Sequence, residues 1–186
     1  ISGYHFEEEI NYIRNYRIKQ QEFAQQQLII KEKQKNLLMT FNLLAEKEAA
    51  RNKPAASLTS HLQQMREYYQ KEFRKQAKFF SCQYTVEEGT NVLNDETLYL
   101  LIQLFEKFLS DPSFGTIDIL IKQKQNQLII ESNTSAFTHH SLDESVVTAT
   151  TNDSHHELEQ AVKRSNGEWH WQNKEKQQYF KITLTL

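Results

Sequence analysis

Residues 6–51 contain neither proline nor glycine, and this uninterrupted stretch constrains the fold more than any other feature of the sequence. It is dominated by Glu, Gln, Lys, Arg, Leu and Ile, which are all compatible with a long α-helix. Pro54 then interrupts the pattern, because proline disfavours a helical residue before it and suits the first turn of a new helix. The sequence therefore predicts one continuous helix over Phe6–Arg51 and a second helix after Pro54.

The second helix carries the clearest apolar stripe in the chain. Leu58, Leu62, Met65, Tyr69 and Phe73 follow one another at intervals of four, three, four and four residues. This spacing places them on one face of a helix that needs a partner. Together the two helices predict a helical hairpin.

The apolar face of the hairpin allows two arrangements. Two copies can pair as a four-helix bundle, so we expect a homodimer; the alternative is an intramolecular helical pair packed on the C-terminal part of the chain. The N-terminal half of the first helix, with Arg17, Gln20 and Gln27 at seam-like spacing, is a poor coiled coil on its own. The expected dimer interface consists of the apolar side chains spaced along both helices: Leu37, Phe41, Leu44, Leu58, Leu62, Met65, Tyr69 and Phe73.

The C-terminal half alternates between strand and helix patterns. Asn94 or Asp95 caps a helix that ends near Asp111-Pro112, and Asn166-Gly167 ends a later helix. The expected strands are Phe79–Val86, Thr116–Lys122, Gln127–Glu131, Glu168–Gln172 and Gln178–Leu186, and residues 132–153 are expected to form a loop. The fold class is thus α+β: a helical lead-in (1–30), a helical hairpin (31–78) and a small α/β sandwich (79–186).

Three stretches carry a resemblance to a known family. Leu128–Phe137 reads as an apolar strand followed by Ser-Asn-Thr-Ser-Ala-Phe, Leu98–Asp111 as an amphipathic helix, and His156–Leu186 as a helix, an Asn-Gly turn and a terminal hairpin. In order and spacing these stretches resemble the ATP-binding domain of sensor histidine kinases, including peptide-quorum kinases, and the sporulation phosphotransferase. The resemblance covers about residues 94–186 and implies a histidine-kinase ATPase fold for the sandwich.

The resemblance also implies a nucleotide site that lacks its usual chemistry. The family has Asp-x-Gly-x-Gly after the strand and an Asn on the preceding helix that binds Mg²⁺. Here Ser132 stands in place of the Asp, while Phe108, which offers no oxygen ligand, falls in or beside the Asn position. The degenerate positions are Phe108, Ser132, Asn133, Thr134 and Ala136, of which Thr134 and Ala136 replace the two glycines. We therefore expect no nucleotide cofactor.

A histidine kinase also needs a histidine on the first helix of its bundle, and none occurs between His5 and His61. We therefore favour a pseudokinase of a two-component system that acts by dimerising and by binding a response regulator or a partner kinase. One alternative is a phosphotransferase that relays phosphate through His61. Others are an active but divergent sensor kinase and a purely structural coiled-coil dimer.

The composition of the chain limits which binding partners and which cellular compartment we expect for it. A formal net charge of -2, from 22 basic and 24 acidic side chains, gives no general attraction to nucleic acid or to anionic membranes. The single cysteine, Cys82, is expected to be a buried strand residue in a reducing compartment. No apolar run is long enough to span a membrane. We expect a cytoplasmic protein, or the cytoplasmic part of a sensor whose membrane region lies upstream.

Two pairs of adjacent histidines, His139-His140 and His155-His156, raise the question of a metal site. Adjacent side chains do not readily point at one ion, and no carboxylate or cysteine cluster completes a ligand set. We expect no metal. Trp169 and Trp171 alternate on one strand and share a face, which we expect to pack against the core.

Overall fold

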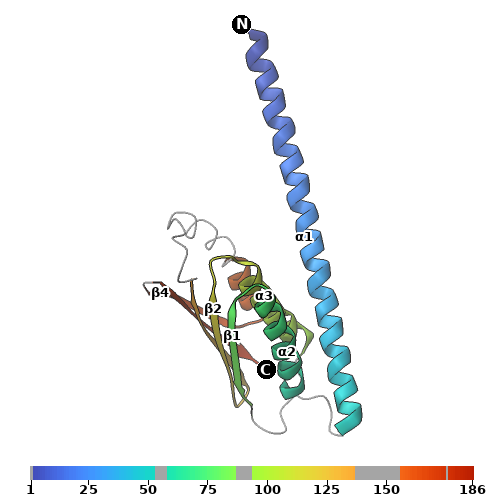
Figure 1. The fold of residues 1–186 in the computed structure, drawn as a ribbon, viewed down its shortest axis with the longest axis vertical. Helices are drawn as coiled ribbons and strands as arrows, with labels where there is room; N and C mark the ends of the chain where they lie inside the picture. Colours follow the sequence, from blue (N-terminus) through green and yellow to red (C-terminus); the bar gives the residue numbers. More distant parts are fainter. Residues whose placement is uncertain (1, 53–57, 87–93, 137–155, 175) are drawn as a thin grey trace. The chain divides into compact units, whose positions relative to one another are not determined.

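The computed structural model describes residues 2–52, 58–86, 94–136, 156–174 and 176–186. The chain divides into two compact units, Ile1–Leu37 and Leu38–Leu186. The elements, in chain order, are α1 (Ser2–Asn52), α2 (Leu58–Lys75), β1 (Phe79–Thr85), α3 (Asp95–Ser110), β2 (Thr116–Lys124), β3 (Gln127–Ser135), a helix over residues 156–164, β4 (Glu168–Lys174) and β5 (Gln177–Thr185) (Figure 1).

The first unit consists of the N-terminal part of α1. Figure 1 shows α1 as one uninterrupted helix, which confirms the long helix that the sequence predicts. Many large apolar side chains in this unit are exposed: Tyr4, Phe6, Ile10, Tyr12, Ile13, Tyr16, Ile18, Phe23, Leu28, Ile29 and Ile30.

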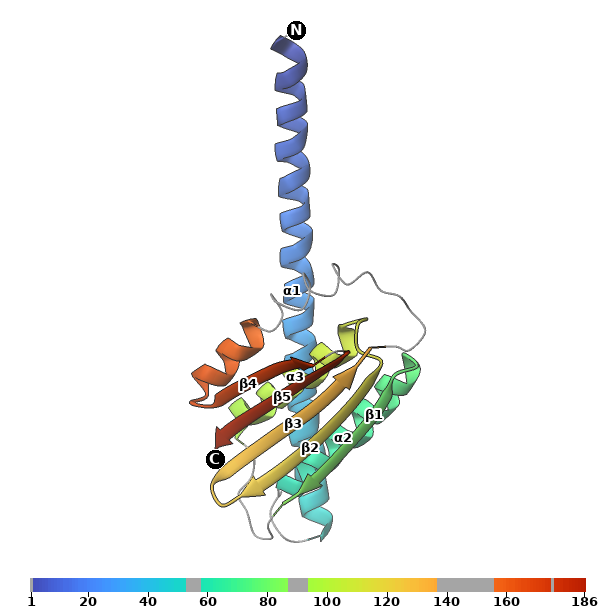
Figure 2. The same cartoon turned by 90° about the vertical axis from the view of Figure 1, so that its left-hand side faces the viewer.

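The second unit is built on a five-stranded sheet with the order β1-β2-β3-β5-β4. β1 and β2 are parallel, and the other neighbouring strands are antiparallel. Figure 2 shows α2, α3 and the helix of residues 156–164 on one face of the sheet, whereas no helix among the described residues covers the other face, which we call the open face. The covered face is apolar in alternate positions, as expected for a sheet with one solvated side; its buried side chains include Ile117, Ile119, Ile121, Leu128, Ile130, Phe180, Ile182 and Leu184.

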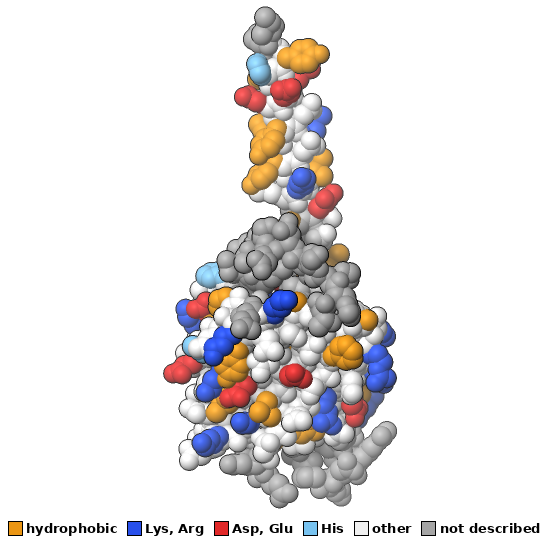
Figure 3. Space-filling view, turned by 60° about the vertical axis from the view of Figure 1, so that its left-hand side comes forward, with side chains coloured by type: hydrophobic (Ala, Val, Ile, Leu, Met, Phe, Trp, Pro, Cys, Tyr) orange, Lys and Arg blue, Asp and Glu red, His pale blue; other side chains and the backbone are white. Residues whose placement is uncertain are grey.

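The open face of the sheet is polar and mixed in charge. Asp118, Lys122 and Asn133 are exposed on it, and Glu131 lies directly across from Lys181. The space-filling view in Figure 3 shows acidic, basic and apolar side chains interspersed over this side of the molecule. Such a surface has no single sign of charge to attract a polyanion.

Strand β3 is longer than the sequence predicts. The prediction ended the strand at Glu131 and began a loop at Ser132, but β3 continues to Ser135. The physical reason is pairing on both sides: Thr134 lies across from Ile117 in β2 and from Gln178 in β5. Two neighbouring strands supply hydrogen-bond partners for residues whose own β propensity is weak.

Side chains satisfy both ends of α3. Asn94 is the N-cap, and its Oδ1 accepts a hydrogen bond of 2.8 Å from the Thr97 amide. At the other end the Lys78 ammonium donates to the carbonyl oxygens of Phe108, Leu109 and Asp111 at 2.8, 2.9 and 2.7 Å. Burial lowers the pKa of Lys78, and the nearby Asp111 carboxylate partly offsets this. The lysine is thus a buried C-terminal cap for α3.

The apolar stripe of α2 packs within its own chain. Tyr69 stacks on Phe105 of α3 at a centroid distance of 4.8 Å, and its hydroxyl donates to Glu106 Oε1 at 3.0 Å. Phe73 stacks on Phe80 of β1 at 4.6 Å, and the Arg66 guanidinium lies 5.0 Å from the centre of the Tyr84 ring. The hairpin helix and the sandwich therefore share one core.

This packing locates the expected dimer-interface residues. Six of them are buried within a single chain: Leu37, Phe41, Leu62, Met65, Tyr69 and Phe73. Leu44 is 36% exposed, and the side chain of Leu58 lies outside the described residues. The homodimer stays a prediction.

The helix of residues 156–164 ends as the sequence predicts, at Asn166-Gly167. Asn166 adopts a positive φ of 53°, and the Gly167 amide donates to the Val162 carbonyl at 2.9 Å. This is a Schellman-type end in which Asn166 takes the left-handed position. Gly167 is needed for space, because a Cβ there would lie 2.7 Å from Leu184 Cδ2 and 2.9 Å from Val162 Cγ1.

Replacing Gly167 with alanine should therefore lower the free energy of unfolding by about 1–3 kcal/mol, the usual cost of overpacking. Urea unfolding followed by far-UV circular dichroism measures the loss. Gly3, whose Cβ position has nothing within 4 Å, provides the control, and Gly3→Ala should leave the midpoint unchanged. Equal midpoints for the two variants would contradict the close approach at Gly167.

Candidate functional site

The site that the resemblance indicates lies between α3 and the covered face of the sheet. Phe108, on the C-terminal half of α3, is fully buried. Its ring lies 5.4 Å from that of Phe114 and 5.7 Å from that of Phe180 on β5. Aromatic side chains therefore surround Phe108, the residue that stands in or beside the expected Asn position.

Ser132 and Thr134 face the same core from β3. Ser132 lies directly across from Phe180, so the register brings two of the expected site positions, 108 and 132, to one aromatic cluster. The Ser132 hydroxyl is buried and has no hydrogen-bond partner in the described part of the chain. Thr134 is also buried, and its hydroxyl donates to the Gln178 carbonyl at 3.4 Å.

The remaining expected positions lie elsewhere. Asn133 is on the open face of the sheet, and Ala136 follows β3 as an exposed residue. Phe137 and the histidines His139 and His140 lie outside the described residues. The structure thus brings Phe108, Ser132 and Thr134 toward one interior and leaves Asn133 outside it.

Lys107 is the cation nearest to this aromatic cluster in sequence, next to Phe108 on α3. Burial lowers its pKa to about 7, although the carboxylates of Asp111 and Glu157 act in the opposite direction. Glu157 belongs to the helix of residues 156–164, so charges from two helices act on the lysine. Sequence reasoning did not single out Lys107, because no local pattern distinguishes it from a solvated lysine.

His61, the candidate phosphate acceptor, is buried in the hairpin and is 2% exposed. Its Nε2 lies 3.2 Å from Asn42 Oδ1, and the Asn42 amide donates to Asp95 Oδ1 at 3.0 Å. These contacts connect α1, α2 and the start of α3. A ring nitrogen that is buried in this way is not accessible to a phosphorylated partner, and phosphoryl transfer requires direct access to it.

The other side chains that the sequence singled out, the histidines, the tryptophans and the cysteine, do not form a site among the described residues. The described residues contain no group of three His, Cys, Asp or Glu side chains placed to hold a metal ion, and His156 is exposed. Trp169 packs on Phe180 at 5.4 Å, which confirms the expected packing against the core. Cys82 is buried in β1 as predicted, and burial raises its pKa to about 11, which disfavours the nucleophilic thiolate at neutral pH.

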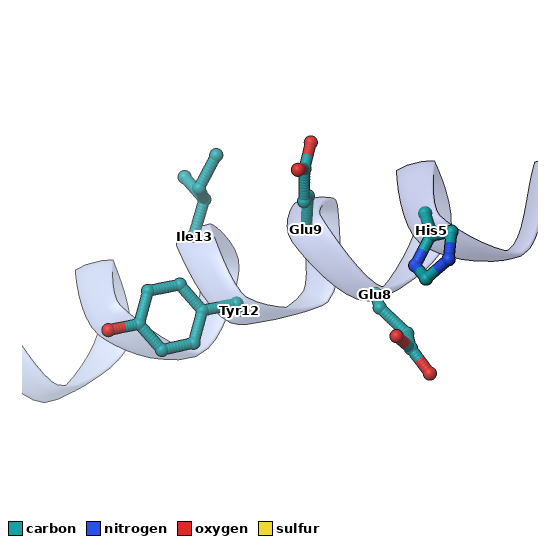
Figure 4. A pocket seen from close by; sticks show the side chains of 5 residues that line it. All are labelled: His5, Glu8, Glu9, Tyr12 and Ile13. Atoms are coloured by element: carbon teal, nitrogen blue, oxygen red, sulfur yellow. The ribbon is translucent and has the colours of Figure 1, made fainter. Parts of the chain in front are cut away.

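A shallow depression lies on the outside of α1, along His5, Glu8, Glu9, Tyr12 and Ile13. Figure 4 shows these side chains leaving successive turns of one helix in different directions. A concave site that encloses a ligand needs walls from more than one element. This depression is therefore not a candidate small-molecule site.

No helix among the described residues is both long and apolar enough to cross a bilayer.

Comparison with known proteins identifies the fold. No family model and no curated protein matches the sequence. The histidine-kinase domain of the blue-light activated kinase EL346 from Erythrobacter litoralis has a TM-score of 0.51 at 12% identity, covering 80% of this chain and 73% of that one. The catalytic domain of the histidine kinase ThkA gives 0.49 at 13% identity, with 69% and 92% covered. The Acinetobacter baumannii kinase AdeS gives 0.46 at 12% identity, with 66% and 61% covered.

The chain therefore has a histidine kinase-like fold, as the resemblance implied. An α+β unit with helices on one face of a five-stranded mixed sheet is the expected architecture. At these identities the likeness extends to the fold alone.

Proposed function

We propose that this chain is a histidine kinase-like protein of two-component signalling whose nucleotide site is degenerate, so that it acts through contacts with other proteins. The observation that carries the proposal is the course of β3. Where the resemblance places a nucleotide-contacting turn, Ser132–Ser135 lie in a strand paired with β2 on one side and with β5 on the other. Backbone groups used in a sheet are no longer available to a nucleotide.

The side chains at these positions support the same proposal. Thr134 stands where the resemblance places a glycine. Its side chain, which a glycine would lack, is buried in the core on the covered face of the sheet. Glycine at such a place lets the backbone approach a ligand closely, and a Cβ with further atoms prevents this. Ser132 offers a neutral hydroxyl where the family has a carboxylate, which weakens recognition of an amino group.

Phe108 supports the loss of the metal. Mg²⁺ in proteins is held by oxygen ligands and by phosphate, and the Phe108 ring supplies none. The ring is packed against Phe114 and Phe180, so it is not placed to swing aside for another ligand.

The attachment of the hairpin to the sandwich favours a protein-binding role over catalysis. A kinase that phosphorylates its own histidine must move its nucleotide domain relative to the helix that carries the acceptor. Here the Tyr69–Phe105 stack and the hydrogen bond from Tyr69 to Glu106 hold α2 on α3. We propose that the hairpin and the sandwich form one fixed surface for a response regulator or a partner kinase.

Titration calorimetry of the full chain with ATP, and with a non-hydrolysable analogue, with and without Mg²⁺, tests the proposal. We expect no binding heat and no thermal shift at millimolar nucleotide. A histidine-kinase domain that keeps Asp-x-Gly-x-Gly, titrated under the same conditions, provides the positive control.

Ser132→Ala separates a lost site from a rebuilt one. The Ser132 hydroxyl is buried and makes no hydrogen bond within the described residues, so its removal should not destabilise the fold and should raise the free energy of unfolding by up to about 1–3 kcal/mol. If the wild-type chain bound ATP with micromolar affinity and Ser132→Ala weakened that binding, the site would be rebuilt and the proposal wrong.

The alternatives keep less support. A phosphotransferase acting through His61 would need that ring to reach a partner, whereas it is buried and bonded to Asn42. An active but divergent kinase would need Mg²⁺ and adenine to bind beside Phe108 and Ser132 without a carboxylate or amide ligand from these positions.

A further inference from the structure

The outer edge of β1 offers hydrogen-bonding groups to a further strand. β1 lies at one end of the strand order, and no described strand pairs with its outer side. The Phe79 amide donates to the Gly115 carbonyl at 2.9 Å, so Phe79 and every second residue after it direct their backbone groups toward β2. The amides and carbonyls of Phe80, Cys82 and Tyr84 therefore point away from the sheet, because these directions alternate along a strand.

β1 lacks the features by which edge strands avoid pairing. Its sequence, Phe-Phe-Ser-Cys-Gln-Tyr-Thr, contains no charged residue and no proline. Its pairing with β2 is continuous from Phe79 to Thr85, without a bulge. Charges, prolines and bulges are the usual protection of an exposed edge. β4, at the opposite end of the sheet, carries Glu168 and Lys174, so the two edges differ in what they permit.

Two arginines of α2 lie beside this edge. Arg66 and Arg74 are eight residues apart, which places them on one side of the helix. On the other side Tyr68 packs on Phe41 of α1, whereas the Arg66 guanidinium lies 5.0 Å from the centre of the Tyr84 ring in β1. The two arginines therefore face the outer edge of β1. Neither forms an ion pair with a carboxylate among the described residues.

The position of α2 also decides what can occupy the edge. α2 lies behind β1 in Figure 2 and packs on it, with Phe73 stacked on Phe80. Two copies of the chain that paired antiparallel through β1 across a two-fold axis would place both α2 helices on the same face. Paired strands lie about 5 Å apart, whereas packed helices need about 8–10 Å between their axes. A second copy is therefore too crowded, while an extended segment without a helix fits.

We propose that the outer edge of β1 binds an extended, acidic segment of another protein, which adds to the sheet as a strand antiparallel to β1. Backbone hydrogen bonds to Phe80, Cys82 and Tyr84 hold the segment. The two arginines select acidic side chains on the side of the segment that faces α2, because they present a single sign of charge. The antiparallel direction gives the more stable ladder. The inference does not depend on the proposed loss of the nucleotide site.

The spacing of the two arginines sets the spacing of the acidic residues. Arg66 lies over Tyr84, and Phe73, next to Arg74, stacks on Phe80, so the arginines lie toward opposite ends of the edge. Their separation in sequence corresponds to about 12 Å along a helix axis. Strand residues at i and i+4 share a face and lie about 13 Å apart. The segment should therefore carry acidic residues four positions apart, with an uncharged residue midway.

A labelled synthetic peptide, Thr-Glu-Thr-Val-Thr-Glu-Thr, tests the proposal on the full chain. Fluorescence anisotropy should show saturable binding that weakens as the salt concentration rises. The peptide in which lysine replaces both glutamates should not bind. An acidic peptide that fails to bind, or a lysine peptide that binds equally well, would overturn the proposal.

Charge reversal on α2 tests which side chains face the segment. Arg66→Glu combined with Arg74→Glu should weaken binding of the acidic peptide at least about tenfold and should allow the lysine peptide to bind. That gain would also show that the variant is folded. The matched control, Lys71→Glu with Lys75→Glu, makes the same change of charge at exposed positions away from the two arginines, and it should keep most of the affinity. Equal losses in the two double variants would contradict the assignment to Arg66 and Arg74.

N-methylation of the peptide tests the strand pairing. In the antiparallel arrangement the amides of the two glutamates and the valine point at β1, whereas those of the threonines point away. Methylating the glutamate and valine amides should abolish binding, and methylating the internal threonine amides should leave it intact. The reverse result would mean parallel pairing, and no difference would mean that the segment does not bind as a strand, so either result counts against the proposal.

Sedimentation with and without the peptide tests for a second copy at the edge. The peptide should bind without changing the oligomeric state of the chain. If it bound only by dissociating a pair of chains, the edge would belong to a contact between copies and the proposal would be wrong.

Discussion

Replacing Phe108 with alanine should lower the free energy of unfolding by about 3–5 kcal/mol, the range for deleting a fully buried aromatic side chain. The ring is 0% exposed and contacts Phe114 and Phe180, so its removal leaves a cavity between α3 and β5. The loss comprises the hydrophobic contribution of the ring and the unfilled volume that remains. Urea unfolding, followed by circular dichroism and by tryptophan fluorescence, measures it.

Phe79→Ala is the matched control, because Phe79 is 75% exposed at the start of β1. Its removal should change stability by no more than about 0.5 kcal/mol. If Phe108→Ala were equally mild, the residue would be a tolerant position at the edge of a ligand site instead of part of the core. The comparison therefore tests the assignment of Phe108 as a structural residue.

Replacing Lys78 with methionine should cost about 2–4 kcal/mol, because two buried carbonyl oxygens and a third that is half-buried lose a charged donor. The methionine keeps the length of the side chain but cannot donate a hydrogen bond. The carbonyls of Phe108, Leu109 and Asp111 would then be left at the end of α3 without the ammonium that now bonds to all three. Relief from burying a cation offsets part of this cost.

Lys75→Met is the control for Lys78. Lys75 is on the surface of α2 and pairs with Glu72 at 2.8 Å. A solvated ion pair of this kind contributes little to stability, and often nothing measurable. Thermal unfolding of both variants should therefore show a clear loss for Lys78→Met and little change for Lys75→Met. The reverse order would mean that the carbonyls at the end of α3 do not need Lys78.

Local patterns explain why much of the fold could be predicted. The continuous helix α1, the cap at Asn94 and the turn at Asn166-Gly167 all depend on residues close together in the sequence. The extension of β3 through Ser132–Ser135 could not be predicted in this way. It depends on pairing with β5, whose residues lie more than forty positions away along the chain.

The same limit applies to the candidate site. The resemblance pointed to Phe108 and Ser132, and the structure brings both to the Phe180 ring. The contact of Lys78 with the Phe108 carbonyl could not be predicted, because a buried lysine that caps a helix has no signature in the sequence. The link from His61 through Asn42 to Asp95 likewise joins three helices whose spacing no periodicity fixes.

The shared core of α2 and the sandwich has a consequence for how this architecture can be divided. Tyr69 and Phe73 cover Phe105 and Phe80, so a fragment that began at β1 would present those two rings to water. The smallest segment with a complete hydrophobic core therefore begins upstream of α2, and recombination with another protein at residue 78 would separate two halves of one core. In this chain α2 and the sandwich therefore belong to one folding unit.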